Sequence, residues 1–228
     1  MAKTIEDLFI FLVFASDILF LFFFFLNNKK LKLFKPIVAA AFYCVADLLV
    51  NFIALEIKQP SVALIAYECF TAVEYTIFAF IIWSNIKNVK FRSFILVISA
   101  LFLTFLPIYY ITADFGSIDS IPIGISTILI LIFSFYFFFE QMNDTQSLFI
   151  YTKYIFWFIT GVMIYLAGSF FIYVSANHVE KSIRETFWLF TNVFYITKNI
   201  FFGIGIYLAL KKKSHSDLNI SHFKPYLN

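Results

Sequence analysis

The chain has 228 residues, of which 62% are hydrophobic and 14% are charged, and its formal net charge is +3. This composition excludes a water-soluble domain, because a chain of this size cannot bury so many apolar side chains. The basic residues stand in short clusters and form no continuous basic surface, which argues against nucleic acid as a partner. We therefore expect an integral membrane protein whose main partner is the lipid bilayer.

Apolar segments long enough to cross a membrane recur along the whole chain. A hydrocarbon core of about 30 Å requires roughly 20 apolar residues in a helix. The sequence therefore predicts an all-α bundle of seven transmembrane helices over residues 1–210, followed by a short basic tail at 211–228. The seven predicted spans are 8–26, 34–56, 63–84, 93–112, 120–140, 150–174 and 187–210.

The connections between these spans predict the orientation of the bundle. Connections on the cytoplasmic side of a membrane are enriched in Lys and Arg. Such residues cluster at 29–35, 87–92 and 211–213, whereas the fourth connection holds Asp114 and Asp119 and no Lys or Arg. We expect the N-terminus outside and the C-terminus in the cytoplasm, in a multi-pass protein of the cell's inner (plasma) membrane.

Four ionisable residues lie near the centres of predicted spans. A charge at the middle of a membrane helix costs about 2.5–3.5 kcal/mol and needs a partner inside the bundle. Asp17, Asp47, Glu74 and Lys198 occupy such positions in the first, second, third and seventh spans, all at about the same depth. The sequence thus predicts a polar core shared by these four helices.

Further polar residues share helix faces with these charges. Helical spacing aligns Tyr43 and Asn51 with Asp47, and it aligns Tyr195 with Lys198. Glu68 lies nearer the outer end of the third span, where it either extends to the interface or lines a vestibule. The predicted ligand-binding or ion-pair cluster comprises Asp17, Asp47, Asn51, Glu74, Tyr195, Lys198 and Asn199, with Tyr67, Glu68, Thr71 and Asn192 as secondary members.

This cluster admits two interpretations. In the structural one, Glu74 and Lys198 form a buried ion pair, and neighbouring polar groups complete the hydrogen bonds that a protein in lipid must satisfy internally. In the functional one, the cluster lines a cavity open to the outside and binds a small ligand or ion, because carboxylates outnumber cations. Which carboxylate pairs with Lys198, Glu74 or Asp47, stays open at this point.

Part of the seventh span resembles that of the microbial rhodopsins. The resemblance lies in the stretch Lys198-Asn199-Ile200-Phe201-Phe202-Gly203, together with the carboxylate of Val73-Glu74-Tyr75 on the third span. It implies that Lys198 carries retinal as a Schiff base and that Glu74 is the counterion. Phe194 stands where that family has an Asp.

The chain also resembles small bacterial seven-helix membrane proteins of unassigned function. The similarity lies in Glu74-Tyr75 on the third span and in the stretch from Phe187-Trp188 to Asn199 on the seventh. It implies a signalling protein, in the membrane or the cytoplasm, as a partner. It assigns no role to any single residue.

Three functions remain open at the level of sequence. The first is a non-enzymatic sensor or accessory protein that binds a small ligand or a partner helix in a cavity between helices one, two, three and seven. The second is an ion- or proton-coupled transporter that uses the midplane carboxylates. The third is a retinal-binding, rhodopsin-like protein. An intramembrane enzyme that uses Asp17, Asp47 and Glu74 as acid and base or as metal ligands is a weaker alternative, because the membrane segments offer carboxylates without His ligands or an activated nucleophile. No metal site is assigned.

Overall fold

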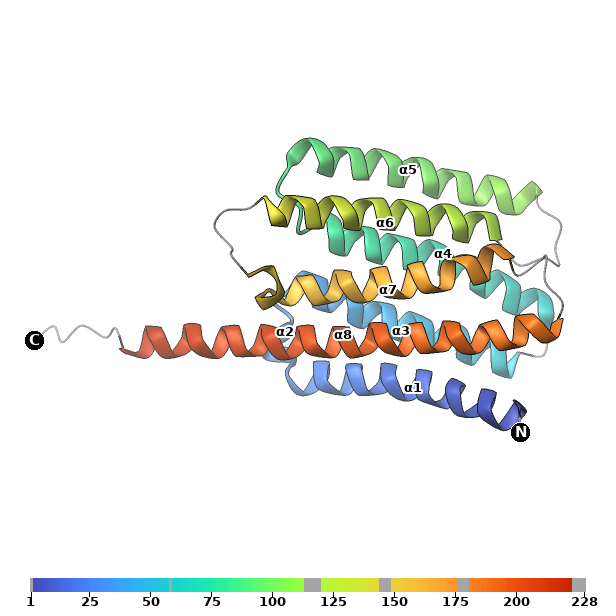
Figure 1. The fold of residues 1–228 in the computed structure, drawn as a ribbon, viewed down its shortest axis with the longest axis horizontal. Helices are drawn as coiled ribbons and strands as arrows, with labels where there is room; N and C mark the ends of the chain where they lie inside the picture. The colour runs from blue at the N-terminus through green and yellow to red at the C-terminus, as the bar shows by residue number, and fades with distance from the viewer. Residues whose placement is uncertain (1, 58, 113–119, 144–148, 176–180, 223–228) are drawn as a thin grey trace, which may run out of the picture.

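The chain folds into a bundle of helices, seen in a computed structural model that describes residues 2–57, 59–112, 120–143, 149–175 and 181–222 (Figure 1). Within these ranges the structure contains no strand. Seven helices are long and apolar enough to cross a membrane, which confirms the predicted all-α, seven-span fold of a multi-pass membrane protein. The elements are α1 (Ala2–Leu26), α2 (Asn28–Leu31), α3 (Lys35–Glu56), α4 (Pro60–Trp83), α5 (Val89–Thr112), α6 (Ser120–Met142), a 3-10 turn at Ile150–Thr152, α7 (Tyr154–Ser175) and α8 (Lys181–His222).

The predicted spans and the observed helices differ mainly at their ends. The sixth span begins at Tyr154 because residues 150–152 form a separate 3-10 turn. The seventh was expected to end at 210, but α8 continues to His222 and takes in much of the predicted tail. Pro36 and Pro60 stand in the first turns of α3 and α4, where the fixed φ of proline suits a helix and its missing N–H is not needed.

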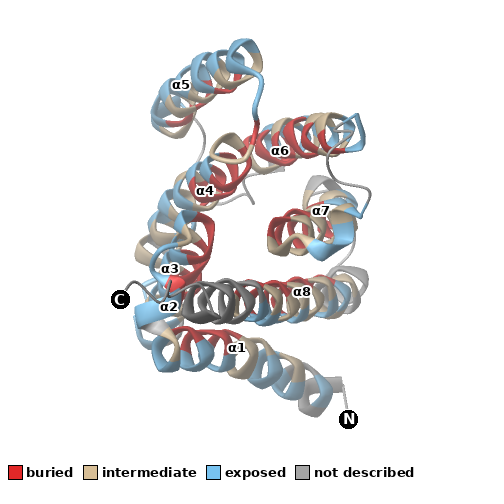
Figure 2. Ribbon diagram, turned by 90° about the vertical axis from the view of Figure 1, so that its left-hand side faces the viewer, coloured by how far each residue is buried: buried red, intermediate tan, exposed pale blue. Residues whose placement is uncertain are grey.

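Six of the seven long helices enclose a common interior. Around this ring α1 packs on α3, α3 on α4, α4 on α6, α6 on α7, α7 on α8, and α8 on α1. The first and last helices are therefore neighbours, and α5 lies outside the ring against α4 and α6 (Figure 2). The helices that bear the four midplane charges, α1, α3, α4 and α8, all belong to the ring.

The outer surface of the bundle is apolar, as contact with lipid requires. Phe11, Phe42 and Phe171 are 66%, 70% and 73% exposed, and many other large hydrophobic side chains point outward with them. Exposed apolar surface of this extent would be unfavourable in water, whereas a bilayer accepts it.

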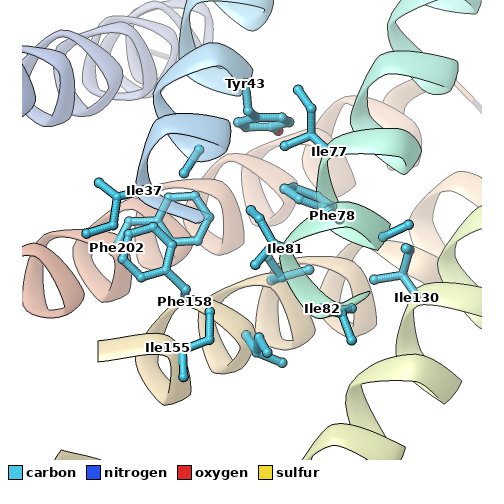
Figure 3. Close-up of a cluster of buried hydrophobic side chains, with 14 of the residues drawn as sticks. Ile37, Tyr43, Ile77, Phe78, Ile81, Ile82, Ile130, Ile155, Phe158 and Phe202 are labelled. Atoms are coloured by element: carbon cyan, nitrogen blue, oxygen red, sulfur yellow. The ribbon is translucent and has the colours of Figure 1, made fainter. Parts of the chain in front are cut away.

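Tightly packed apolar side chains fill the interior on the side away from the N-terminus. Figure 3 shows these residues meeting between α3, α4, α7 and α8. The rings of Phe158 and Phe202 stack with their centroids 4.6 Å apart. We call five of these residues the apolar plug, because none is more than 1% exposed: Ile37, Ile81, Ile82, Phe158 and Phe202.

Candidate functional site

A cavity of about 460 Å³ lies within the ring, in the half of the bundle where α1 begins. All six ring helices contribute to its wall, from Val13 of α1 to Tyr195 of α8. Tyr67, one of the residues that line it, is 46% exposed. The polar residues that line it are Asp47, Asn51, Tyr67, Thr71, Glu74, Thr127, Tyr165, Ser169, Tyr173, Thr191, Asn192 and Tyr195.

Two carboxylates stand in this wall, on adjacent helices. Asp47 of α3 is 6% exposed, and its Oδ2 accepts a hydrogen bond of 2.9 Å from Asn51 Nδ2, one turn along the same helix. Glu74 of α4 accepts a hydrogen bond of 3.0 Å from the hydroxyl of Tyr43 on α3. Each carboxylate is thus oriented by a donor, and both face the same cavity.

A sealed polar layer lies directly beneath the cavity, centred on Asp17 of α1. Asp17 is 0% exposed. The Tyr195 hydroxyl lies 3.1 and 3.0 Å from its two carboxylate oxygens, and Asn199 Nδ2 donates to its Oδ1 at 2.9 Å. The same amide nitrogen of Asn199 lies 2.7 Å from Ser16 Oγ. Directional bonds from α8 therefore fix Asp17 in place.

Lys198 lies in the same layer, held by aromatic faces. Its Nζ is 3.5 Å from the ring centroid of Tyr195, 3.9 Å from that of Tyr43 and 5.0 Å from that of Tyr165. The side chain is 0% exposed, and Nζ has no hydrogen-bond partner among the described residues. A cation above an aromatic face is attracted by the negative potential of the ring. Lys198 therefore occupies an aromatic cage.

The direct ion pair expected between Glu74 and Lys198 does not form. Tyr43 separates the two groups, because its ring packs against Lys198 Nζ while its hydroxyl binds Glu74. Asp47, the other expected partner, takes its hydrogen bond from Asn51 instead. Asp17 lies in the same layer as Lys198, and Tyr195 connects the two groups, since its hydroxyl binds Asp17 and its ring lies against Lys198 Nζ.

The structure divides the residues predicted from the sequence into three groups. Most of them line the cavity, whereas Asp17, Lys198 and Asn199 lie behind its wall in the sealed layer. Glu68 is half-buried on α4 and is not among the described lining residues. The predicted residues that line the cavity are Asp47, Asn51, Tyr67, Thr71, Glu74, Asn192 and Tyr195.

Sequence reasoning missed the contribution of the fifth and sixth spans, α6 and α7. Thr127 of α6 and three residues of α7, Tyr165, Ser169 and Tyr173, complete the cavity wall. The residues on α7 follow an i, i+4, i+8 pattern, which was the available signal for a shared helix face. Tyr43, which the spacing places on the same helix face as Asp47 and Asn51, proves central to the cage around Lys198.

The arrangement does not fit a retinal Schiff base at Lys198. Lys198 is not among the described residues that line the cavity, and the rings of Tyr43 and Tyr195 occupy the space next to Nζ. A polyene attached to that atom would have to displace both rings. Within the described ranges, no group of three or more His, Cys, Asp or Glu side chains is arranged to hold a metal ion.

Comparisons with protein-family models, with curated proteins and with solved structures found no match for this chain. The interpretation of function therefore depends on the chemistry of the cavity and the layers beneath it.

Proposed function

We propose that this chain is a non-enzymatic membrane receptor or accessory protein that binds a small ligand in the cavity enclosed by the six ring helices. The cavity itself carries the proposal. Its volume, about 460 Å³, lies within the range of roughly 300–1,000 Å³ that is usual for small-molecule sites. Such sites combine apolar and aromatic walls with a few polar groups that orient the ligand. In the orientation predicted by the loop charges, the cavity faces the outside of the cell.

The apolar plug favours a receptor over a transporter. An ion- or proton-coupled carrier needs polar groups that connect its midplane site with both faces of the membrane. Along α8, Tyr195 and Lys198 are followed one turn later by Phe202, which stacks on Phe158 of α7. Ile37, Ile81 and Ile82 close the same level from α3 and α4. The cavity therefore ends above a packed apolar layer.

The helix α8 offers a route from the cavity to a partner protein. It contributes Tyr195 to the cavity wall and Lys198 to the sealed layer. Its membrane-crossing part ends at Lys211, and the same helix continues to His222. A ligand that displaces α8 on one side of the membrane would move the segment beyond Lys211 on the other, where we expect a signalling protein to bind.

Filling the cavity tests this proposal. Ser169→Trp places a large ring into the cavity wall from a side chain that is 1% exposed. Ala167→Trp, two residues away on the exposed face of α7, is the matched control. Each protein is extracted gently from its own membranes, and the small molecules and proteins that stay with it are recorded by native and denaturing mass spectrometry.

We expect the wild type and Ala167→Trp to retain the same small molecule or partner, and Ser169→Trp to lose it while keeping wild-type helicity and a monodisperse elution profile. A folded Ser169→Trp protein with unchanged co-purifying molecules would contradict a ligand site in the cavity. Flux assays in proteoliposomes add a second check. A pH-dependent flux that disappears with Glu74→Gln would favour a transporter instead.

A further inference from the structure

Among the described residues at the core of the bundle, buried acidic groups outnumber basic ones. Three carboxyl groups, those of Asp17, Asp47 and Glu74, lie within electrostatic reach of a single ammonium group, that of Lys198. None of the described residues that line the cavity is Lys, Arg or His. Uncompensated charge inside a protein in lipid is unfavourable. The interior would therefore be stabilised either by protonation of a carboxyl group or by a further positive charge on the cavity side, and only the second requires a bound molecule.

The aromatic cage shows how this interior holds an ammonium group. Lys198 Nζ has no hydrogen-bonding partner among the described residues and lies instead against the ring faces of Tyr43 and Tyr195. Contacts of this kind are favourable when the cation is desolvated, and they recur in sites for quaternary ammonium ligands. Aromatic faces near carboxylates thus form the surroundings of the one buried amino group that the described residues hold.

The cavity wall repeats these components one level above the cage. Tyr165 and Tyr195 belong to both the cage and the wall. Tyr67, Phe70 and Tyr173 add three further aromatic side chains to the wall, close to the carboxylates of Asp47 and Glu74. The chemistry that accommodates Lys198 is therefore available to a molecule inside the cavity.

We infer that the ligand of this cavity is a small organic cation, an amine or a quaternary ammonium compound. Its charge lies between Asp47 and Glu74, and its carbon groups pack against the tyrosine rings and Phe70. This inference rests on the proposed function, since it requires that a small molecule enters the cavity, and it adds the charge and chemical class of that molecule.

An organic cation fits the wall better than an anion or a metal ion. The two carboxylates disfavour an anion. A bound metal ion requires several oxygen, nitrogen or sulfur ligands around one point, and the described residues offer no group of three His, Cys, Asp or Glu side chains so arranged. Ring faces and a cavity of about 460 Å³ suit a larger cation with a diffuse charge.

Pairs of charged and uncharged probes of equal shape test the inference. The probes are choline with its isostere 3,3-dimethyl-1-butanol, and phenethylamine with 2-phenylethanol. Binding to the full chain in lipid nanodiscs is measured by isothermal titration calorimetry at constant ionic strength. We expect at least one amine to bind more tightly than its uncharged isostere by about tenfold or more, because only the amine compensates the carboxylates.

Variants of the carboxylates locate the effect. Glu74→Gln and Asp47→Asn should each weaken amine binding by about tenfold or more and leave binding of the uncharged isostere unchanged. Glu56→Gln, at an exposed carboxylate at the end of α3 and outside the described cavity wall, is the matched control and should bind like the wild type. Circular dichroism confirms that each variant is folded. If one of the two carboxylate variants does not fold, the other still tests the inference.

Equal affinity for an amine and its isostere, or no binding of either amine, would overturn the inference. Saturable binding of Na⁺ or Ca²⁺ without amine binding would overturn it as well and would point to a metal ion. These outcomes differ from failure of the proposed function. If an uncharged probe binds to the wild type and not to Ser169→Trp, the cavity is a ligand site of another chemical class. If Ser169→Trp changes no bound molecule at all, both proposals fail.

Discussion

The two halves of the bundle fill their interiors by different means. Toward the end where α1 begins, side chains are held by directional bonds, such as those from Tyr195 to Asp17. Toward the other end the side chains are held by close van der Waals packing, as in the stack of Phe158 on Phe202. Directional bonds can be exchanged for bonds to a ligand, whereas close packing tolerates little change. We call the end where α1 begins the polar half and the opposite end the apolar half. The polar half can therefore rearrange around a ligand, whereas the apolar half holds the helices in a fixed arrangement.

The largest effect should follow the loss of the positive charge of Lys198, which is buried in the polar half. Lys198→Met keeps an unbranched side chain of similar length and removes the charge that attracts Asp17. A buried charge left without compensation costs about 3–5 kcal/mol. We expect a loss of that order in the free energy of unfolding, measured by SDS titration in mixed micelles.

A second substitution should repair this loss. Asp17→Asn combined with Lys198→Met removes both charges and keeps an acceptor for the Tyr195 hydroxyl and the Asn199 amide. We expect the double variant to regain most of the stability. If it is no more stable than Lys198→Met alone, the cost comes from lost packing in the aromatic cage and not from charge.

A smaller effect should follow the removal of one hydroxyl from the same layer. Tyr195→Phe keeps the ring that lies 3.5 Å from Lys198 Nζ and removes the donor to Asp17. A hydrogen bond to a charged group contributes about 1.5–3 kcal/mol. The same SDS titration should show a loss in this range. Tyr207→Phe, at an exposed tyrosine about three turns further along α8, should show none.

In the apolar half, added volume should be harmful where the helices are in contact. A Cβ at Gly205 would clash with the ring of Phe158 and lie 3.1 Å from the carbonyl oxygen of Tyr154, whereas a Cβ at Gly203 would meet nothing within 4 Å. Overpacking costs about 1–3 kcal/mol. Gly205→Ala should therefore lower the unfolding midpoint, and Gly203→Ala should leave it unchanged or raise it slightly. Equal effects at both positions would show that α7 and α8 separate easily.

The smallest effect should appear at the periphery, where α5 meets α4. The guanidinium of Arg92 lies 4.3 Å from the ring centroid of Trp83. Such contacts contribute about 0.5–1 kcal/mol near a surface. Arg92→Gln should lower the melting temperature slightly, and Lys90→Gln, at an exposed position in the same turn, should not. Identical melting curves for the two variants would show that this contact does not help to hold α5.

The sequence was sufficient to predict the helices and the depth of the charged residues. Long apolar runs set the spans, and counting residues along a helix gives the depth of each side chain in the membrane. This reasoning placed Asp47 and Glu74 at the level where both line one cavity. It also identified Lys198 as buried, which the structure confirms at 0% exposure.

What could not be predicted depends on how each helix is rotated and which helices are neighbours. Asp17 and Asp47 look equivalent in the sequence, but Asp17 is sealed between α1 and α8 while Asp47 faces the cavity. Tyr43 and Tyr165 were not expected around Lys198. The chain has 13 tyrosines, and no spacing in the sequence distinguishes those whose rings contact a buried amino group from the rest. Both features follow from tertiary packing.

The apolar plug beneath the polar half has a thermodynamic consequence. A cavity closed at one end exchanges molecules with a single compartment, so its occupancy at equilibrium depends on the concentration in that compartment alone. In this conformation the packed rings of Phe158 and Phe202 separate the cavity from the far side of the membrane. If the bundle is the receptor that we propose, it measures a concentration and performs no osmotic work.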